Sequence, residues 1–271
     1  MSVNPAAIWS DVESIRGRVP LIHSITNLVV MQGNANALLA LGAAPVMAHA
    51  PEEMEDMVAL AGALVINIGT LNAEWVGAMH LAAEVANARG VPVILDPVGA
   101  GATRMRTRVV GDLLRNHQVA ILRGNASEIL ALGGGEGGTR GVDAMAGSEQ
   151  AVGSARELAR RHGCAVAVSG AADYVTDGAR VVRVDNGHPM LTRVTGMGCA
   201  ASALVAAFRA VNPDAVSAAV HGMVVMGVAG EVAAERASGT GSMAMEFLDA
   251  LSRLSENELR VRARACELPS T

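Results

Sequence analysis

The chain alternates short apolar runs with longer segments of helical spacing. Four runs of mostly Val, Ile, Leu and Ala lie at residues 64–69, 91–99, 119–124 and 164–170, and each ends in glycine. Segments 75–89 and 150–162 are rich in Ala and Leu at helical intervals. Strands that are apolar at nearly every position are typical of a parallel sheet covered on both faces, and their alternation with helices indicates βαβ units. We therefore predict an α/β fold with a doubly wound, mostly parallel sheet flanked by helices.

The pattern changes at two places in the C-terminal half. Residues 173–184 hold two valine-containing runs around an Asp177-Gly178 step, which favours a hairpin turn, so we expect an antiparallel addition to the sheet. From Cys199 onward the pattern is helical, with a break at Asn212-Pro213 and a second helix ending near residue 238. The sequence shows no linker or internal repeat, and residues 1–271 are predicted to form one domain.

In open α/β sheets, ligands bind beyond the carboxyl ends of the strands. The residues that follow or close the apolar runs are therefore the candidates for function. They are Asn27, Met47, Asn67, Asp96, Arg123, Ser169 and the turn at residues 195–199.

Composition narrows the class of protein. The chain has 271 residues, 51% hydrophobic and 17% charged, which excludes a disordered chain, and its net charge of -5 gives no electrostatic basis for nucleic-acid binding. The N-terminal segment carries Asp11 and Glu13 and does not resemble a signal peptide. Apolar stretches such as residues 59–68 are too short to span a bilayer. The three cysteines form no CxxC pair, so a disulfide framework is not expected and a reducing compartment is favoured. Together with the lack of a long apolar stretch, this predicts a cytoplasmic protein without membrane contact.

All 21 basic residues are Arg, and the chain contains no Lys. This composition excludes a Walker-A lysine, a Schiff-base lysine and the strand lysine of protein kinases. Any phosphate charge must be met by Arg, by a metal ion or by backbone amides.

The turn at residues 195–199, Thr-Gly-Met-Gly-Cys, precedes a run of small residues that favour a helix. Amides of Gly196, Met197, Gly198 and Cys199 at that helix start would form an anion-binding pocket suited to a phosphoryl group. The helix start is also expected to lower the pKa of the Cys199 thiol below its free value of about 8.5. The alternatives are an ordinary glycine turn and a cysteine that only packs.

Two carboxylates follow neighbouring apolar runs. Asp96 precedes a glycine-containing loop, and Glu128 lies just after the run that contains Arg123. Such a pair suits Mg²⁺, which keeps most of its waters and binds phosphates. Alternatively, Asp96 caps a turn and Glu128 is a solvated helix residue. Arg123 closes an apolar strand, where it meets either a phosphate or a structural carboxylate; Ser169 is a weaker candidate.

Other features carry less weight. Residues 239–244 imitate a dinucleotide-binding fingerprint but follow a helix rather than a strand. The histidines show no metal-ligand spacing, and the 14 Met residues are more typical of core filling than of a site.

The ordered set of motifs resembles the hydroxyethylthiazole kinase family, which has a ribokinase-like fold. The resemblance runs from about residue 20 to residue 251 and rests on residues 25–31, 35–43, 45–48, 67–71, 95–102, 123–126, 128, 141–143 and 195–199. The glycine loop is shared with other ribokinase-like kinases. The regions of Asn27, Met47 and Cys199 are more specific to the thiazole kinases.

The resemblance implies ATP-dependent phosphorylation of 4-methyl-5-(2-hydroxyethyl)thiazole, a salvage step towards thiamine. By matching position, Met47 and Gly196 would contact the thiazole, with Asn27 beside them. Arg123 and Ser169 would contact ATP, although the family often has Thr at the second position. Asp96 and Glu128 match positions linked to Mg²⁺, and Cys199 stands where most ribokinase-like sugar kinases have a catalytic Asp. The family is typically a homotrimer with active sites between subunits, which would bring Met47 near a neighbour's pocket.

Two stretches depart from the family pattern. Residues 103–106 replace a stretch that usually contains Pro and an aromatic residue, so we expect a differently shaped loop after Asp96. Residues 139–140, Thr-Arg, replace a Gly-Lys pair.

Other functions remain open on sequence grounds. The nearest alternative is another ribokinase-like kinase that acts on a hydroxymethylpyrimidine or a sugar. A non-catalytic nucleotide or vitamin binder is the second. An NAD oxidoreductase would rest only on the imitation fingerprint at residues 239–244.

Overall fold

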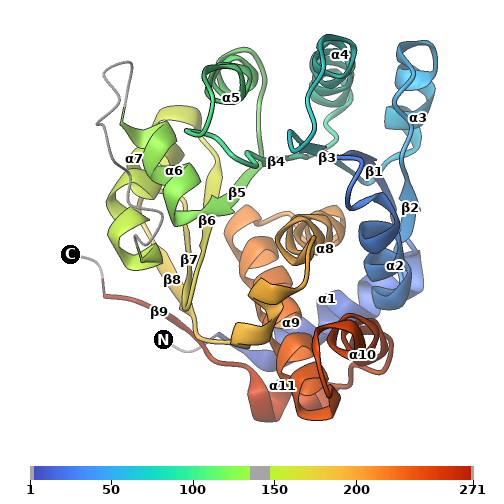
Figure 1. The fold of residues 1–271 in the computed structure, drawn as a ribbon, viewed down its shortest axis with the longest axis vertical. Coiled ribbons are helices and arrows are strands. Elements are labelled where there is room, and N and C mark those ends of the chain that lie inside the picture. The colour runs from blue at the N-terminus through green and yellow to red at the C-terminus, as the bar shows by residue number, and fades with distance from the viewer. Residues whose placement is uncertain (1–2, 135–146, 270–271) are drawn as a thin grey trace.

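The computed structural model describes residues 3–134 and 147–269. In this part of the chain one sheet of nine strands has the order β2-β1-β3-β4-β5-β6-β7-β8-β9 (Figure 1). The strands are β1 Leu21–Ile25, β2 Ala44–Val46, β3 Ala63–Asn67, β4 Val93–Asp96, β5 Ile121–Asn125, β6 Ala165–Ser169, β7 Asp173–Thr176, β8 Val181–Val184 and β9 Ala265–Glu267. Neighbours from β2 to β6 are parallel, and β6 to β9 continue the sheet with antiparallel pairs.

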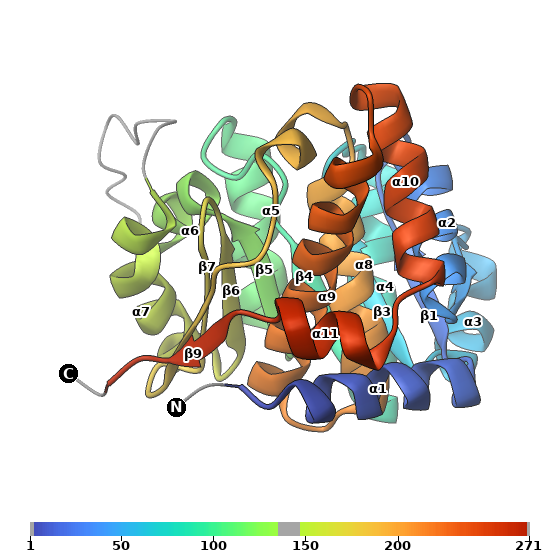
Figure 2. The same cartoon turned by 90° about the horizontal axis from the view of Figure 1, so that it is seen from below.

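Helices cover both faces of this sheet (Figures 1 and 2). The buried cluster on one face joins the strands to α1 Pro5–Arg18, α2 Met31–Leu41, α8 Met197–Val211, α9 Ala215–Arg236, α10 Thr240–Ser252 and α11 Glu256–Arg262. The cluster on the other face joins them to α3 Met54–Leu60, α4 Ala73–Arg89, α5 Arg104–Asn116, α6 Ala126–Gly133 and α7 Val152–His162.

The alternation of side chains along each strand explains why the strands are apolar throughout. Val65 belongs to the first cluster, whereas its neighbours Leu64 and Ile66 belong to the second. Ile94 and Leu95 divide in the same way between the two faces. Because successive strand residues point to opposite faces, a sheet covered twice needs apolar side chains at every position.

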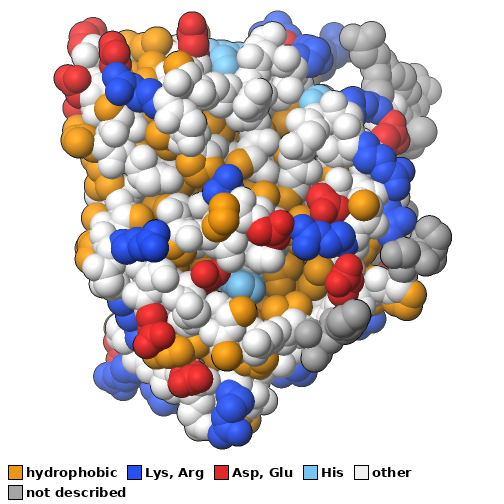
Figure 3. All heavy atoms as spheres, turned by 180° about the vertical axis from the view of Figure 1, so that it is seen from behind, with side chains coloured by type: hydrophobic (Ala, Val, Ile, Leu, Met, Phe, Trp, Pro, Cys, Tyr) orange, Lys and Arg blue, Asp and Glu red, His pale blue; other side chains and the backbone are white. Residues whose placement is uncertain are grey.

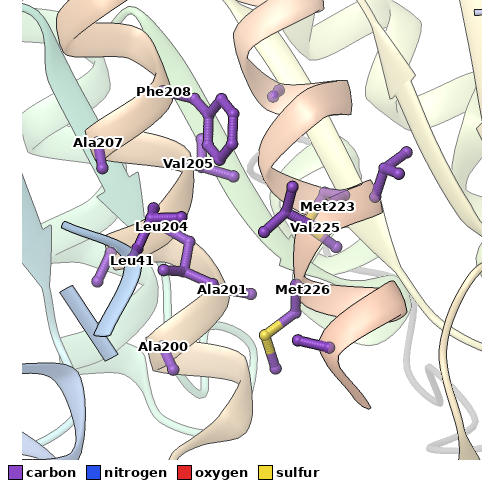
Figure 4. Packing of buried hydrophobic residues seen from close by; sticks show 14 of the residues in the cluster. Leu41, Ala200, Ala201, Leu204, Val205, Ala207, Phe208, Met223, Val225 and Met226 are labelled. Atoms are coloured by element: carbon purple, nitrogen blue, oxygen red, sulfur yellow. The ribbon is translucent and has the colours of Figure 1, made fainter. Parts of the chain in front are cut away.

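Helices α8 and α9 are the centre of the first cluster. Figure 4 shows Val205 and Phe208 of α8 facing Met223 and Val225 of α9 across a narrow gap. Both helices are rich in Ala, Gly and Val, and small side chains let their backbones approach closely. This packing holds α8 against β3 and β4, with its N-terminus directed to the edge where the parallel strands end.

Helix α9 alone among the described helices is long and apolar enough to cross a membrane by length and composition, but 83% of its most apolar window is buried in the protein. A helix that is apolar on all sides is typical of the core of a large domain as well as of a membrane. From the sequence alone, only shorter apolar stretches, such as residues 59–68, had been candidates for a membrane span.

The structure confirms the predicted strands and helices and the antiparallel hairpin, with shifts of a few residues at their ends. The expectation that the chain is helical from Cys199 onward is wrong at the end, because residues 265–267 form β9 beside β8. That strand has three residues, too few for a pattern in the sequence. The family-like motif at residues 141–143, the departure at residues 139–140 and most of the glycine loop at 133–138 lie outside the described residues.

Candidate active site

Residues predicted for function meet at the edge of the sheet where its parallel strands end. Asn67 and Asp96 are the last residues of β3 and β4 and are register partners. Ser169 ends β6 opposite Asn125, the last residue of β5. Arg123 is inside β5, two residues before its end, rather than after it.

A buried polar network joins Asn27, Asn67, Asp96, Ser202 and Cys199. The Asp96 Oδ2 atom accepts hydrogen bonds from Asn67 Nδ2 and from the Ser202 hydroxyl, each 2.8 Å long. Asn27 Nδ2 donates to Asn67 Oδ1 at 2.9 Å and to the Cys199 sulfur at 3.5 Å. Both donors bond the Oδ2 atom of Asp96, and neither of them bonds Oδ1. The network therefore orients one carboxylate and one thiol at the start of α8.

Asp96 is only 2% exposed. Loss of solvent is the main cause that raises the pKa of Asp96; the Glu128 carboxylate also raises it, whereas Arg123 and the two hydrogen-bond donors lower it, and the net result is a pKa of about 7. An acidic group in this range is balanced between its two protonation states near neutral pH. A nearby cation would favour the carboxylate form.

The expected low pKa of Cys199 is wrong. Burial and the Asp96 charge raise the pKa of Cys199 to about 11, outweighing the lowering effect of Asn67, Asn27 and Arg123. The helix start does not compensate for partial burial next to a carboxylate. At neutral pH the group is therefore a thiol.

The turn at residues 195–199 forms the predicted glycine bend. Gly196 has a φ of 86°, a left-handed conformation that favours glycine, and it is the N-cap of α8. Ala200 donates the first bond of the helix to the Gly196 carbonyl at 2.8 Å. The amides of Met197, Gly198 and Cys199 precede that bond and have no partner within the helix. Such a set of amides at a helix start can bind an anion.

Arg123 supports this bend from β5. Arg123 is only 7% exposed, and its Nη1 donates a hydrogen bond of 2.8 Å to the Gly198 carbonyl. Its Nε is buried without a hydrogen-bond partner. None of the carboxylates in the described segments lies within ion-pair distance of this guanidinium. A buried cation with spare donors beside a ring of amides suits an anionic ligand.

Glu128 is part of a capping box. Its Oε2 accepts a hydrogen bond from the backbone N–H of Asn125, and the side-chain oxygen of Asn125 accepts one from the backbone N–H of Glu128. The other carboxylate oxygen, Oε1, accepts from the backbone N–H of Gly99 at 2.8 Å. Glu128 is 8% exposed, so the alternative of a solvated helix residue is wrong. The carboxylate ties the loop after β4 to the start of α6.

The donor set is compatible with Mg²⁺. Asp96 and Glu128 carry carboxylate oxygens, and Glu128 is close enough to affect Asp96 electrostatically. Within residues 3–134 and 147–269, no group of three or more His, Cys, Asp or Glu forms a complete metal site. Mg²⁺ commonly uses one or two carboxylates and completes its shell with water and phosphate, so these residues fit that ion better than Zn²⁺.

A cavity of about 510 Å³ opens beside the glycine bend. Arg123, Ser169, Met197 and Gly198 line one part of it. A further part is apolar and is lined by residues such as Leu191, Ala201, Met223 and Met226. The lining of the cavity therefore combines a guanidinium and polar groups with apolar side chains, a combination that suits a nucleotide.

A second cavity, of about 260 Å³, lies on the other side of the bend. Its lining includes Val30, Gly196, Met197 and Phe247. Met47, just after β2, lines neither cavity. The structure thus brings Asn27, Asp96, Arg123 and the bend together but leaves Met47 apart in the single chain.

Sequence reasoning missed Ser202 and Asp173. Ser202 is the only polar residue in an otherwise apolar run at 200–208, and this isolation was a usable signal. Asp173 lines the larger cavity and accepts from the Gly170 amide at 2.9 Å. Burial raises the pKa of Asp173 to about 6. Its place at the start of the hairpin gave no sequence signal of a site.

The fold and this site define a protein of the ribokinase-like fold. A pyridoxal kinase from Staphylococcus aureus in complex with ADP has the same fold, with a TM-score of 0.61, 14% identity, and coverage of 79% of this chain and 88% of that one.

A family profile described as the hydroxyethylthiazole kinase family matches residues 12–257, so the chain belongs to that family. A hydroxyethylthiazole kinase of Nitratidesulfovibrio vulgaris (strain Miyazaki F) is 53% identical over 95% of this chain and 96% of that protein. One from Syntrophus aciditrophicus is 53% identical over 97% and 98%. The solved structure of a hydroxyethylthiazole kinase protein from Pyrococcus horikoshii OT3 has a TM-score of 0.91, 47% identity, and coverage of 97% and 100%.

Proposed function

We propose that this protein transfers the γ-phosphoryl group of ATP to the hydroxyl of 4-methyl-5-(2-hydroxyethyl)thiazole in thiamine salvage. Full-length relatives near 50% identity that carry the kinase name support this activity. The observation in the molecule that carries it is the glycine bend, with three unpaired helix-start amides, a buried Arg123 and the Asp96 network around it.

ATP would occupy the larger cavity. Arg123 would bind its phosphates, and Ser169 would contact them from the end of β6. The apolar side chains of Met223 and Met226 would face the base. The amides from Gly196 to Cys199 would receive the transferring group, whose charge rests on its equatorial oxygens.

The thiazole alcohol would lie near Asn27, Gly196 and Cys199, with Met47 as a further contact. A thiol with a pKa near 11 is a hydrogen-bond partner for the substrate hydroxyl rather than a ready proton acceptor. Positioning of the hydroxyl is therefore its main contribution. Asp96 and Glu128 would hold Mg²⁺, which supplies charge neutralisation for the phosphates when it is bound.

The remaining expectations concern assembly and location. Residues 1–271 would act as one domain in the cytoplasm, as a homotrimer with active sites between subunits. The position of Met47 outside both cavities supports this arrangement, since a neighbouring chain could complete its contacts. Apolar side chains also gather at the left margin of Figure 3, on the side of α2 and α3. Leu39 of α2, Leu60 of α3, and Leu28 and Val29 just before α2 are each more than half exposed.

The decisive experiment incubates the purified protein with ATP, Mg²⁺ and the thiazole alcohol and detects the phosphorylated thiazole by mass spectrometry. Parallel reactions with a hydroxymethylpyrimidine and with sugars test the neighbouring kinases. If calorimetry shows that the thiazole binds but no ADP is released, the protein is a non-catalytic binder and the proposed kinase activity is wrong. Product formation with the thiazole alone among these acceptors is the expected result.

A further inference from the structure

Arg106 joins two loops of the candidate site by its guanidinium. It lies in the first turn of α5 and reaches back to the ends of β3 and β4. Its Nη1 donates to the Val98 carbonyl at 2.5 Å, and its Nη2 donates to the Gly69 carbonyl at 2.6 Å. These carbonyls are two residues beyond Asp96 and Asn67, so one side chain spans both loops.

Gly69 is the point where this bridge meets the polar network. Its amide donates to Asn67 Oδ1 at 3.0 Å, while its carbonyl accepts from Arg106. A side chain at Gly69 would collide with Asn27, because a Cβ there would be 2.7 Å from Asn27 Nδ2. The loop is thus held between Arg106 on one side and Asn27 on the other. Any shift of Gly69 must move the two amide side chains that orient Asp96 and Cys199.

The chemistry of Arg106 fits this role. Its partners are two backbone carbonyls on different loops, and the described carboxylates form no ion pair with it. A planar guanidinium can donate to two acceptors at fixed angles, and charge-assisted bonds are the stronger kind. A lysine ammonium carries three donors on one nitrogen and lacks the planar pair of nitrogens with which Arg106 bonds the two loops.

We propose that Arg106 is a positioning residue for phosphoryl transfer: it fixes the spacing of the β3 and β4 loops so that Asn67 orients Asp96 and Asn27 orients Cys199. The inference rests on the proposed function, because the step that it supports is the transfer. Arg106 acts through other residues and is not itself assigned to ATP or the thiazole.

The test compares Arg106→Met and Arg106→Lys with Arg108→Met, an exposed arginine on the same helix. For Arg106→Met we expect kcat to fall about 10- to 100-fold, as for the loss of a charge-assisted hydrogen bond. The KM for the thiazole should change less than kcat, and the Mg²⁺ concentration for half-maximal rate should rise. Arg106→Lys should retain an intermediate kcat, and Arg108→Met should match the wild type.

A readout without turnover separates this inference from the proposed function. Hydrogen–deuterium exchange across residues 67–71 should be faster in Arg106→Met than in the wild type and in Arg108→Met. Unchanged exchange there, or a kcat within twofold of wild type, overturns the positioning role. If Arg106→Met does not fold, the same two measurements on Arg106→Lys decide. A wild-type protein that forms no phosphorylated thiazole refutes the proposed function, whereas the exchange result still tests the bridge.

Discussion

The two halves of the sheet edge that carries the site differ in whether their polar side chains are hydrogen-bonded to one another or face a cavity. At the ends of β3 and β4, Asn67 and Asp96 are buried in a network of hydrogen bonds to one another and to neighbouring side chains. Arg123 inside β5 and Ser169 at the end of β6 open onto a cavity of about 510 Å³. The glycine bend at residues 195–199 lies between the two halves and contributes to both.

The half at β3 and β4, the closed half, orients side chains rigidly, whereas the half at β5 and β6, the open half, keeps groups free to bind a ligand. Side chains whose partners are already in place lose little freedom when substrate arrives, so the closed half suits groups that act on the reacting atoms. The open half keeps spare donors, such as the unpaired Arg123 Nε, for a ligand that brings its own acceptors. Substitutions in the closed half should therefore affect kcat, and those in the open half KM for ATP.

The largest effect is expected from Asp96→Ala in the closed half. Loss of the carboxylate should slow turnover about 10³-fold at low Mg²⁺, the upper range for one preorganised electrostatic group. High Mg²⁺ should restore part of the rate if Asp96 binds the ion. Initial rates across a Mg²⁺ titration measure this, with Asp112→Ala on the surface of α5 as the control. An unchanged Mg²⁺ dependence contradicts the ligand role.

Cys199→Ala should be next, with a fall in kcat of about 10²-fold, the effect of misplacing a reacting group when a contact that positions it is lost. Cys199→Ser should keep more activity, because a hydroxyl can replace the neutral thiol as a hydrogen-bond partner. Steady-state kinetics on both variants and on Cys266→Ala, a thiol in β9, provide the comparison. Wild-type turnover in Cys199→Ala would mean that the thiol only packs.

Arg123→Met tests the open half. We expect KM for ATP to rise about 10- to 100-fold, the effect of one hydrogen bond to a charged group, with a smaller change in KM for the thiazole. The surface substitution Arg183→Met on β8 serves as the control. Equal rises in both KM values would show that Arg123 shapes the bend rather than binding the nucleotide.

The smallest effect concerns stability and Asp173. Burial holds its pKa at about 6 in the folded protein, above the unfolded value of about 3.9. The folded state therefore binds its proton more tightly, and this carboxyl makes unfolding easier as pH rises from about 4 to 6. In thermal melts without ATP, the Tm of Asp173→Asn should fall less over that range than the Tm of the wild type. Parallel curves for wild type and variant would exclude this contribution, and Asp249→Asn controls for a surface change.

Much of the site was predictable because its residues obey a local rule. Polar residues that close apolar runs identified Asn27, Asn67, Asp96 and Arg123, and the glycine spacing identified the bend. The pKa of Cys199 was not predictable, because it depends on burial and on Asp96, about one hundred residues away in the chain. The bridge made by Arg106 was also hidden, since the altered loop at residues 103–106 had indicated only a change in shape.

The sequence alone determined the alternating strands and helices, the absence of lysine and the family to which the chain belongs. These follow from local residue patterns, which neighbouring positions specify. Only the tertiary structure decided that Ser202 and Asn67 converge on one oxygen of Asp96, that Glu128 holds the Gly99 loop, and that Met47 stays apart. Hydrogen-bond partners and local dielectric depend on how helices and strands pack, and residues distant in the chain set both.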